Sequence, residues 1–164
     1  VIGCGIFNGG RQLNAKVEKL ETIFMDGENQ DGLSIHYDLT KIDDSLSYFL
    51  SLAKKYNVNT KAVKTLDTLH KDFNELESID EYSKWYDEIK SLYPYAISEL
   101  KGLNLTSQHR SMLNKYEATL NSAMHTIAYS HFNSEVRSYK KESDSLFANM
   151  IKMITGVKGV DSFD

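Results

Sequence analysis

Residues 106–141 read TSQHRSMLNKYEATLNSAMHTIAYSHFNSEVRSYKK, and this stretch decides the fold. Apolar side chains recur in it every three or four residues from Leu113 to Tyr139, with no glycine or proline between them. This spacing places them on one stripe of an α-helix, which has 3.6 residues per turn. The stretch therefore predicts one amphipathic helix from Thr106 to Lys141, roughly 50 Å long at about 1.5 Å per residue.

The rest of the chain predicts shorter helices with the same period. Their apolar stripes fall within residues 6–24, 42–56 and 60–92. The only proline, Pro94, is expected to end the last of these, because proline disfavours the helical conformation of the residue before it. We therefore expect an all-α fold, namely an elongated, antiparallel, up-and-down bundle of three to four helices with one very long C-terminal helix.

Composition narrows the classes of function. The chain has 164 residues, which is enough to bury a core as a single domain. Its formal net charge of -4 argues against nucleic acid as a partner, because a surface that follows phosphates needs clustered Lys and Arg. The single cysteine, Cys4, excludes a disulfide within the chain and a metal site built from several cysteines.

Catalytic and metal-binding patterns are missing from the sequence. No phosphate-binding glycine loop or nucleophile-elbow motif occurs, and no two histidines are spaced to meet on one helix face. The acidic stretch that begins at Asp26 lacks the glycine and glutamate that a calcium loop requires. We therefore predict no catalytic residue, no cofactor and no metal ion, and expect a protein that is not an enzyme.

The first residues suggest a membrane connection. Val1-Ile-Gly-Cys4 has the form of a lipobox, in which a small residue precedes a cysteine that is cleaved free and lipidated. The alternatives are the end of an uncleaved membrane helix and a frayed start of the first helix. We interpret residues 1–5 as the remnant of a lipoprotein signal or membrane segment, and residues 6–164 as a single helical-bundle domain. Buried acyl chains contribute about 0.8 kcal/mol per CH₂ to such an anchor.

The sequence resembles the LemA family of bacterial envelope proteins, most specifically in its C-terminal third. The segment Phe132-Asn-Ser-Glu-Val-Arg-Ser-Tyr139 is similar to the family signature Tyr-Asn-x-x-Val-x-x-Tyr-Asn. Further similarities are Asn149-Met-Ile151, Gly156, Phe163, Tyr93-Pro94 and the N-terminal Gly3-Cys-Gly-Ile-Phe-Asn8. The family's Arg-Arg-x-Asp-Leu-Ile-Pro-Asn-Leu-Val block is missing, Lys140 replaces the second asparagine of the signature, and Phe147 replaces a proline.

This resemblance implies a helical bundle held at a membrane and supplies no enzymatic activity. We therefore expect a non-enzymatic scaffold or protein-interaction module of the bacterial cell envelope, anchored to the cell membrane or outer membrane through its N-terminus. Cys4 is the predicted lipid-attachment residue, and Asn133 and Tyr139 are predicted to lie on an interaction face. The alternative is a protein that binds a small ligand or a signal peptide through an aromatic cluster near Trp85 and Tyr93.

Overall fold

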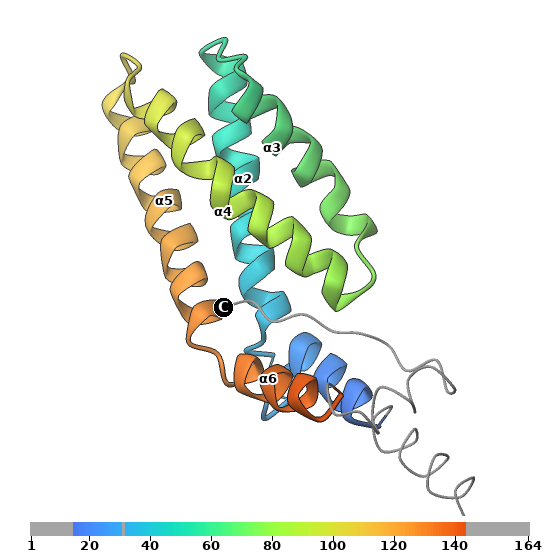
Figure 1. Ribbon diagram of the computed structural model, residues 1–164. Helices are drawn as coiled ribbons and strands as arrows, with labels where there is room; N and C mark the ends of the chain where they lie inside the picture. Colours follow the sequence, from blue (N-terminus) through green and yellow to red (C-terminus); the bar gives the residue numbers. More distant parts are fainter. Residues whose placement is uncertain (1–14, 31, 144–164) are drawn as a thin grey trace, which may run out of the picture. The chain divides into compact units, whose positions relative to one another are not determined.

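The computed structural model describes residues 15–30 and 32–143 (Figure 1). All regular structure in these residues is helical, which confirms the all-α class. The helices are residues 15–26, α2 (Ile35–Lys55), α3 (Lys61–Asp72), the 3₁₀ turn η1 (Phe73–Glu75), α4 (Ile79–Lys101), α5 (Ser107–Ala128) and α6 (His131–Ser143). Each helix in this described part is too short or too polar to span a membrane.

The chain divides into two compact units. Unit 1 combines residues up to Tyr37 with residues from Ala128 onward, and unit 2 is Asp38–Ile127. Unit 2 is thus inserted between the two segments of unit 1. The single domain predicted for residues 6–164 stays a prediction, because one domain can contain two such units.

Unit 2 is a helical bundle made by α2, α3, α4 and α5 (Figure 1). Side-chain contacts join these helices in a closed order, α2 to α3, α3 to α4, α4 to α5 and α5 to α2. The pairs are Asp43–His70, Leu69–Trp85, Tyr86–Met124 and the stacked rings of Tyr48 and Tyr116. Side chains that are almost fully buried form the core, among them Leu46, Leu66, Ile89, Leu100, Leu113 and Leu120.

Unit 1 packs residues 15–26 against α6. The rings of Phe24 and Phe132 lie 5.7 Å apart between centroids. Val17 and Val136 are buried as well. On the surface of this unit, the Lys19 ammonium lies 3.8 Å from a carboxylate oxygen of Glu135.

Capping side chains set where the helices of unit 2 begin. Thr60 accepts a hydrogen bond from the Val63 N–H at the start of α3, as expected from its position. Ser78 and Glu81 form a capping box, so the chain breaks before α4. The second helix starts earlier than its apolar stripe at 42–56 suggests, because the Ser34 hydroxyl accepts from the N–H of Tyr37 and caps it at Ile35.

The prediction that Pro94 ends a helix is wrong. α4 continues through Pro94 to Lys101 and ends at Gly102. Proline cannot donate a hydrogen bond to the carbonyl of Lys90, one turn earlier. Pro94 is exposed at this point, so water can satisfy that carbonyl, while Ile89 and Ile97 keep the buried face continuous.

The predicted single helix from Thr106 to Lys141 is divided in two. α5 ends at Ala128, and α6 begins at His131 after the non-helical Tyr129 and Ser130. Hydrogen bonds made by the Ser130 and Asn133 side chains stabilise this interruption. The apolar stripe therefore covered the residues of both helices but carried no information about the break between them.

Candidate interaction site

Two residues proposed for an interaction face are buried. Asn133 is 1 % exposed and Tyr139 is 2 % exposed. The Asn133 side-chain amide donates to the carbonyl of Ala128, 3.3 Å away, so it caps the end of α5 at the break before α6. The prediction that these two side chains present a face to a partner is therefore wrong. Cys4, the predicted lipid-attachment residue, lies outside the described residues.

Trp85 and Tyr93 contact different neighbouring helices. Trp85 is 3 % exposed, and its indole N–H donates to the carbonyl of Leu69 at 2.8 Å, on the side facing α3. Tyr93 faces α5 instead, where its hydroxyl donates to Asn121 at 3.0 Å. Burial raises the pKa of the Tyr93 phenol, followed by the effect of the Glu117 charge. Trp85 thus contributes to the core, and a ligand site that combines it with Tyr93 stays a prediction.

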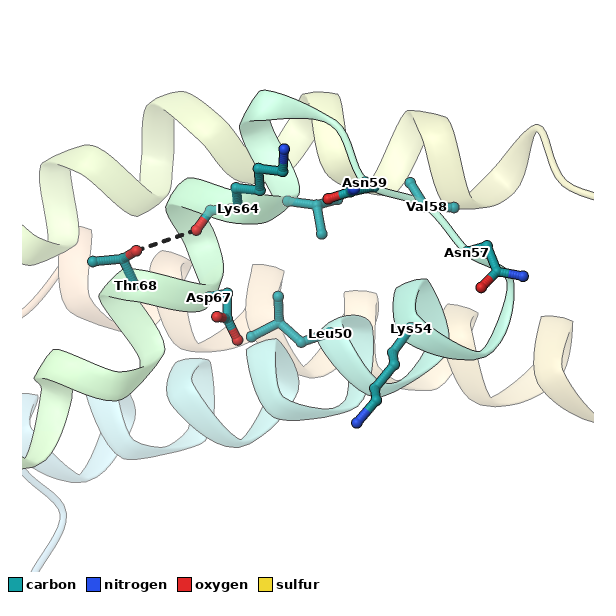
Figure 2. Close-up of a pocket in the computed structure, with 9 residues that line it drawn as sticks. Leu50, Lys54, Asn57, Val58, Asn59, Lys64, Asp67 and Thr68 are labelled. Atoms are coloured by element: carbon teal, nitrogen blue, oxygen red, sulfur yellow. Dashed lines mark hydrogen bonds between the residues drawn. The ribbon is translucent and has the colours of Figure 1, made fainter.

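An open groove of about 620 Å³ lies between α2 and α3, where the short loop joins them (Figure 2). Leucine and valine side chains contribute its apolar part, and lysine, asparagine, aspartate and threonine side chains surround them. The residues that line it are Leu50, Lys54, Asn57, Val58, Asn59, Val63, Lys64, Asp67 and Thr68.

The loop beside this groove has a defined conformation. α2 ends in a Schellman motif, in which the Val58 N–H donates to Ala53 at 2.8 Å and the Asn57 N–H to Lys54 at 3.3 Å. Asn57 takes the required left-handed conformation with φ of 58°, which asparagine tolerates better than most residues. The Thr60 hydroxyl then donates to Glu99 of α4 at 2.6 Å. These bonds hold the loop in place next to the groove.

The charges at the groove are unbalanced. Lys54 and Lys64 stand on its opposite sides (Figure 2), and Lys61 is exposed nearby. In the part of the chain that the structure describes, none of these three ammonium groups forms an ion pair. Asp67 is the only carboxylate in the lining, and it lies 2.5 Å from the Lys71 ammonium, which offsets its charge. The groove therefore presents positive charge that no neighbouring side chain neutralises.

A second polar cluster lies on the other side of α2 and joins it to α5. The Tyr56 hydroxyl is 2.7 Å from His109 Nδ1, and Lys55 Nζ is 3.3 Å from His109 Nε2. An ammonium only donates, so the Lys55 contact makes Nε2 the acceptor and Nδ1–H the donor to Tyr56. Tyr56 also accepts from the Thr106 N–H at 3.3 Å. This cluster ties the loop after α2 to the loop before α5.

These contacts define the tip of unit 2, which consists of loops 56–60 and 102–106 with the adjoining helix ends (Figure 1). Basic side chains predominate there: Lys54, Lys55, Lys61, Lys64, Lys101 and Arg110 accompany Glu99. Acidic side chains predominate at the opposite end: Asp38, Asp43, Asp44, Asp72, Glu75, Glu77, Asp80 and Glu81 accompany Lys41, Lys71 and Lys84. The chain enters and leaves unit 2 at the acidic end.

Asp43, which is buried, and His70, which is half-buried, form a dyad at the acidic end, with Oδ1 and Nδ1 2.8 Å apart. Burial raises the pKa of Asp43, and the hydrogen bond from His70 opposes this shift. Such a pair orients an imidazole, yet it supplies neither a nucleophile nor a metal. Among the described residues, no group of three His, Cys, Asp or Glu could hold a metal ion. The dyad is best understood as a link between α2 and α3.

The groove and the unpaired lysines were not predicted. One sequence signal could have found them: residues 45–66 contain four lysines and no acidic residue. Lys54 and Lys64 are ten positions apart, so only the loop geometry shows that both line one groove.

No family model matches the chain, and neither a curated protein nor a solved structure is similar enough to it to count as a match. The resemblance to the LemA family therefore stays a prediction that rests on the motif residues alone.

Proposed function

We propose that the chain is a non-enzymatic helical-bundle protein of the bacterial cell envelope, tethered to a membrane near its N-terminus and holding a partner protein at the tip of unit 2. In this proposal α2 to α5 run up and down as an elongated antiparallel bundle. The tip then lies about 30 Å from the entry point of the chain, because α2 has 21 residues at about 1.5 Å each.

The observation that carries the proposal is the set of unpaired lysines at the tip. Lys54 lies in the last turn of α2, and Lys61 and Lys64 lie in the first turn of α3. None of the three has an ion-pair partner among the described residues. Concentrated charge of one sign disfavours the folded state through self-repulsion, and it also steers an oppositely charged partner toward the surface that carries it. A surface for an acidic partner accounts for both the position and the excess of these charges.

The tether rests on a different observation. Val1-Ile-Gly-Cys4 has the residue types that a lipoprotein signal peptidase recognises before a lipidated cysteine. The LemA resemblance points to the same location, the cell membrane or outer membrane. A tether at Cys4 and a binding surface at the tip would bring a partner protein to the membrane that carries the lipid.

Site-specific cross-linking in cells tests the binding surface. A photoreactive amino acid at Lys61, which is exposed beside the groove, should capture a discrete protein partner when the full chain is expressed. The same amino acid at Lys84, an exposed lysine at the acidic end, is the matched control. Cross-linking that is equal at the two positions, or absent at Lys61, would contradict the proposed surface.

A separate experiment tests the tether. The Cys4→Ser variant, expressed from its own gene, should move from the membrane fraction to the soluble fraction, because serine cannot form the thioether that holds the lipid. Metabolic labelling with a fatty-acid analogue should mark the parent protein and not the variant. A variant that stays in the membrane fraction without label would show that the anchor is not a lipid on Cys4.

A further inference from the structure

The groove between α2 and α3 points to a specific class of ligand. We propose that it binds an acidic peptide segment of the partner, with an apolar side chain on Leu50, Val58 and Val63 and carboxylates at Lys54 and Lys64. This inference rests on the proposed function and specifies it, since it names the site on the tip and the chemistry of the bound segment.

The size and lining of the groove suit such a segment. Its volume of about 620 Å³ lies within the range of roughly 300–1,000 Å³ that small-ligand sites occupy. Leu50 and Val58 are partly exposed, so the groove retains apolar surface that a leucine or valine side chain would cover. That contact would contribute binding free energy by removing apolar area from water.

The polar groups around this apolar surface favour carboxylates. Lys54 and Lys64 stand on opposite sides of the groove, and hydrogen bonds between ammonium and carboxylate are stronger than those between neutral groups (Figure 2). The amides of Asn57 and Asn59 add further donors at the loop end. Asp67, which is already paired with Lys71, lies away from the loop, so the unpaired donors for the acidic residues of the segment are Lys54, Lys64 and the two asparagines.

The shape of the site distinguishes a peptide from a membrane surface. A lipid surface is broad and contacts lysines that project from a convex or flat face. Here the lysines flank a concavity, and apolar side chains lie between them. A peptide can place one side chain into the concavity while its neighbours reach both lysines, and lipid headgroups would leave the apolar part uncovered.

Titration of the full chain with a short, labelled peptide of glutamates around one central leucine tests the inference. Fluorescence polarisation should show saturable binding. Lys54→Glu and Lys64→Glu should each weaken it about tenfold or more, because each places like charge against the ligand. Lys84→Glu makes the same change of charge at the acidic end and should leave affinity unchanged. All three lysines are exposed, so the variants should keep the parent melting temperature.

Two further arms separate the components of binding. A peptide with serine in place of leucine should bind more weakly to the parent protein. Amide NMR shifts on titration should concentrate at Leu50, Val58 and Val63. Equal weakening by Lys84→Glu, or shifts centred on His109, would overturn the inference, because binding would then follow net charge or use the other side of α2.

Vesicles of phosphatidylglycerol form the last arm. Binding to these vesicles that Lys54→Glu and Lys64→Glu abolish, together with no binding of the peptide, would overturn the inference in favour of a membrane contact. The proposed function can fail separately. If the Lys61 cross-link to a protein survives Lys54→Glu and Lys64→Glu, the tip binds a partner but the groove is not the site.

Discussion

α4 contains a proline and stays helical, whereas the chain between α5 and α6 leaves the helix without a proline or a glycine. Pro94 lies seven residues before Lys101, the last residue of α4, on the exposed side of the helix. Tyr129 and Ser130 interrupt a stretch whose apolar spacing is regular on both sides. The usual helix breaker is thus tolerated in one region, and ordinary residues break the helix in the other.

The difference lies in which backbone groups find partners. At Pro94 one hydrogen bond is lost on a face that water reaches, and the buried residues before and after it keep their register. At Ser130 the hydroxyl accepts from the Phe132 N–H at 3.2 Å, and Asn133 donates to the Ala128 carbonyl at 3.3 Å. These bonds satisfy the ends of both helices, so the interruption costs less than a bare break would.

The largest effect is expected from Pro94→Ala. Alanine restores the N–H that the Lys90 carbonyl lacks, and proline in a helix interior is about 3 kcal/mol less favourable than alanine. The free energy of unfolding should therefore rise by up to about 3 kcal/mol, measured by urea denaturation. Ser98→Ala, one turn later on the exposed side, should change it by less than about 0.5 kcal/mol. A decrease for Pro94→Ala would mean that the proline stabilises α4.

Asn133→Leu tests the other region and should have the next largest effect. The side chain is buried, so the change leaves the Ala128 carbonyl without its donor, and an unsatisfied buried polar group costs about 1–3 kcal/mol. We expect the free energy of unfolding to fall by about 2 kcal/mol. Asn114→Leu, at an exposed position of α5, is the matched control and should be nearly neutral. Equal effects at the two positions would show that the buried hydrogen bond is unimportant.

These two regions also explain how much of the fold could be predicted. The apolar period located the helical stretches, but it gave residues 60–92 as one stripe and residues 106–141 as one helix, whereas the chain leaves the α-helix after Asp72 and again after Ala128. The period says nothing about backbone hydrogen bonds, so it could not show that Asn133 would turn inward and cap α5. The prediction for Pro94 used the average effect of proline on a helix, and that average ignores whether the lost hydrogen bond faces water.

The groove could not be predicted from the sequence for a related reason. The interval between the apolar stripes at 42–56 and 60–92 marks where one helix ends and the next begins, but a groove needs the relative position of two helices. Lys54 and Lys64 come together only because the Schellman motif at Asn57 turns the chain back. Cys4 is the opposite case, since its prediction depends on a local motif and needs no tertiary structure.

The smallest effect is expected from Ser130→Ala, which removes the hydroxyl that accepts from Phe132 and leaves the Asn133 contact in place. Loss of such a capping side chain costs about 1 kcal/mol. Hydrogen exchange at the Phe132 amide should accelerate by roughly fivefold, the equivalent of that free energy. Ser130→Asp keeps an acceptor at the same position and should preserve the protection. If Ser130→Ala instead slows exchange there, α5 and α6 have joined into one helix, and the hydroxyl rather than Asn133 maintains the break.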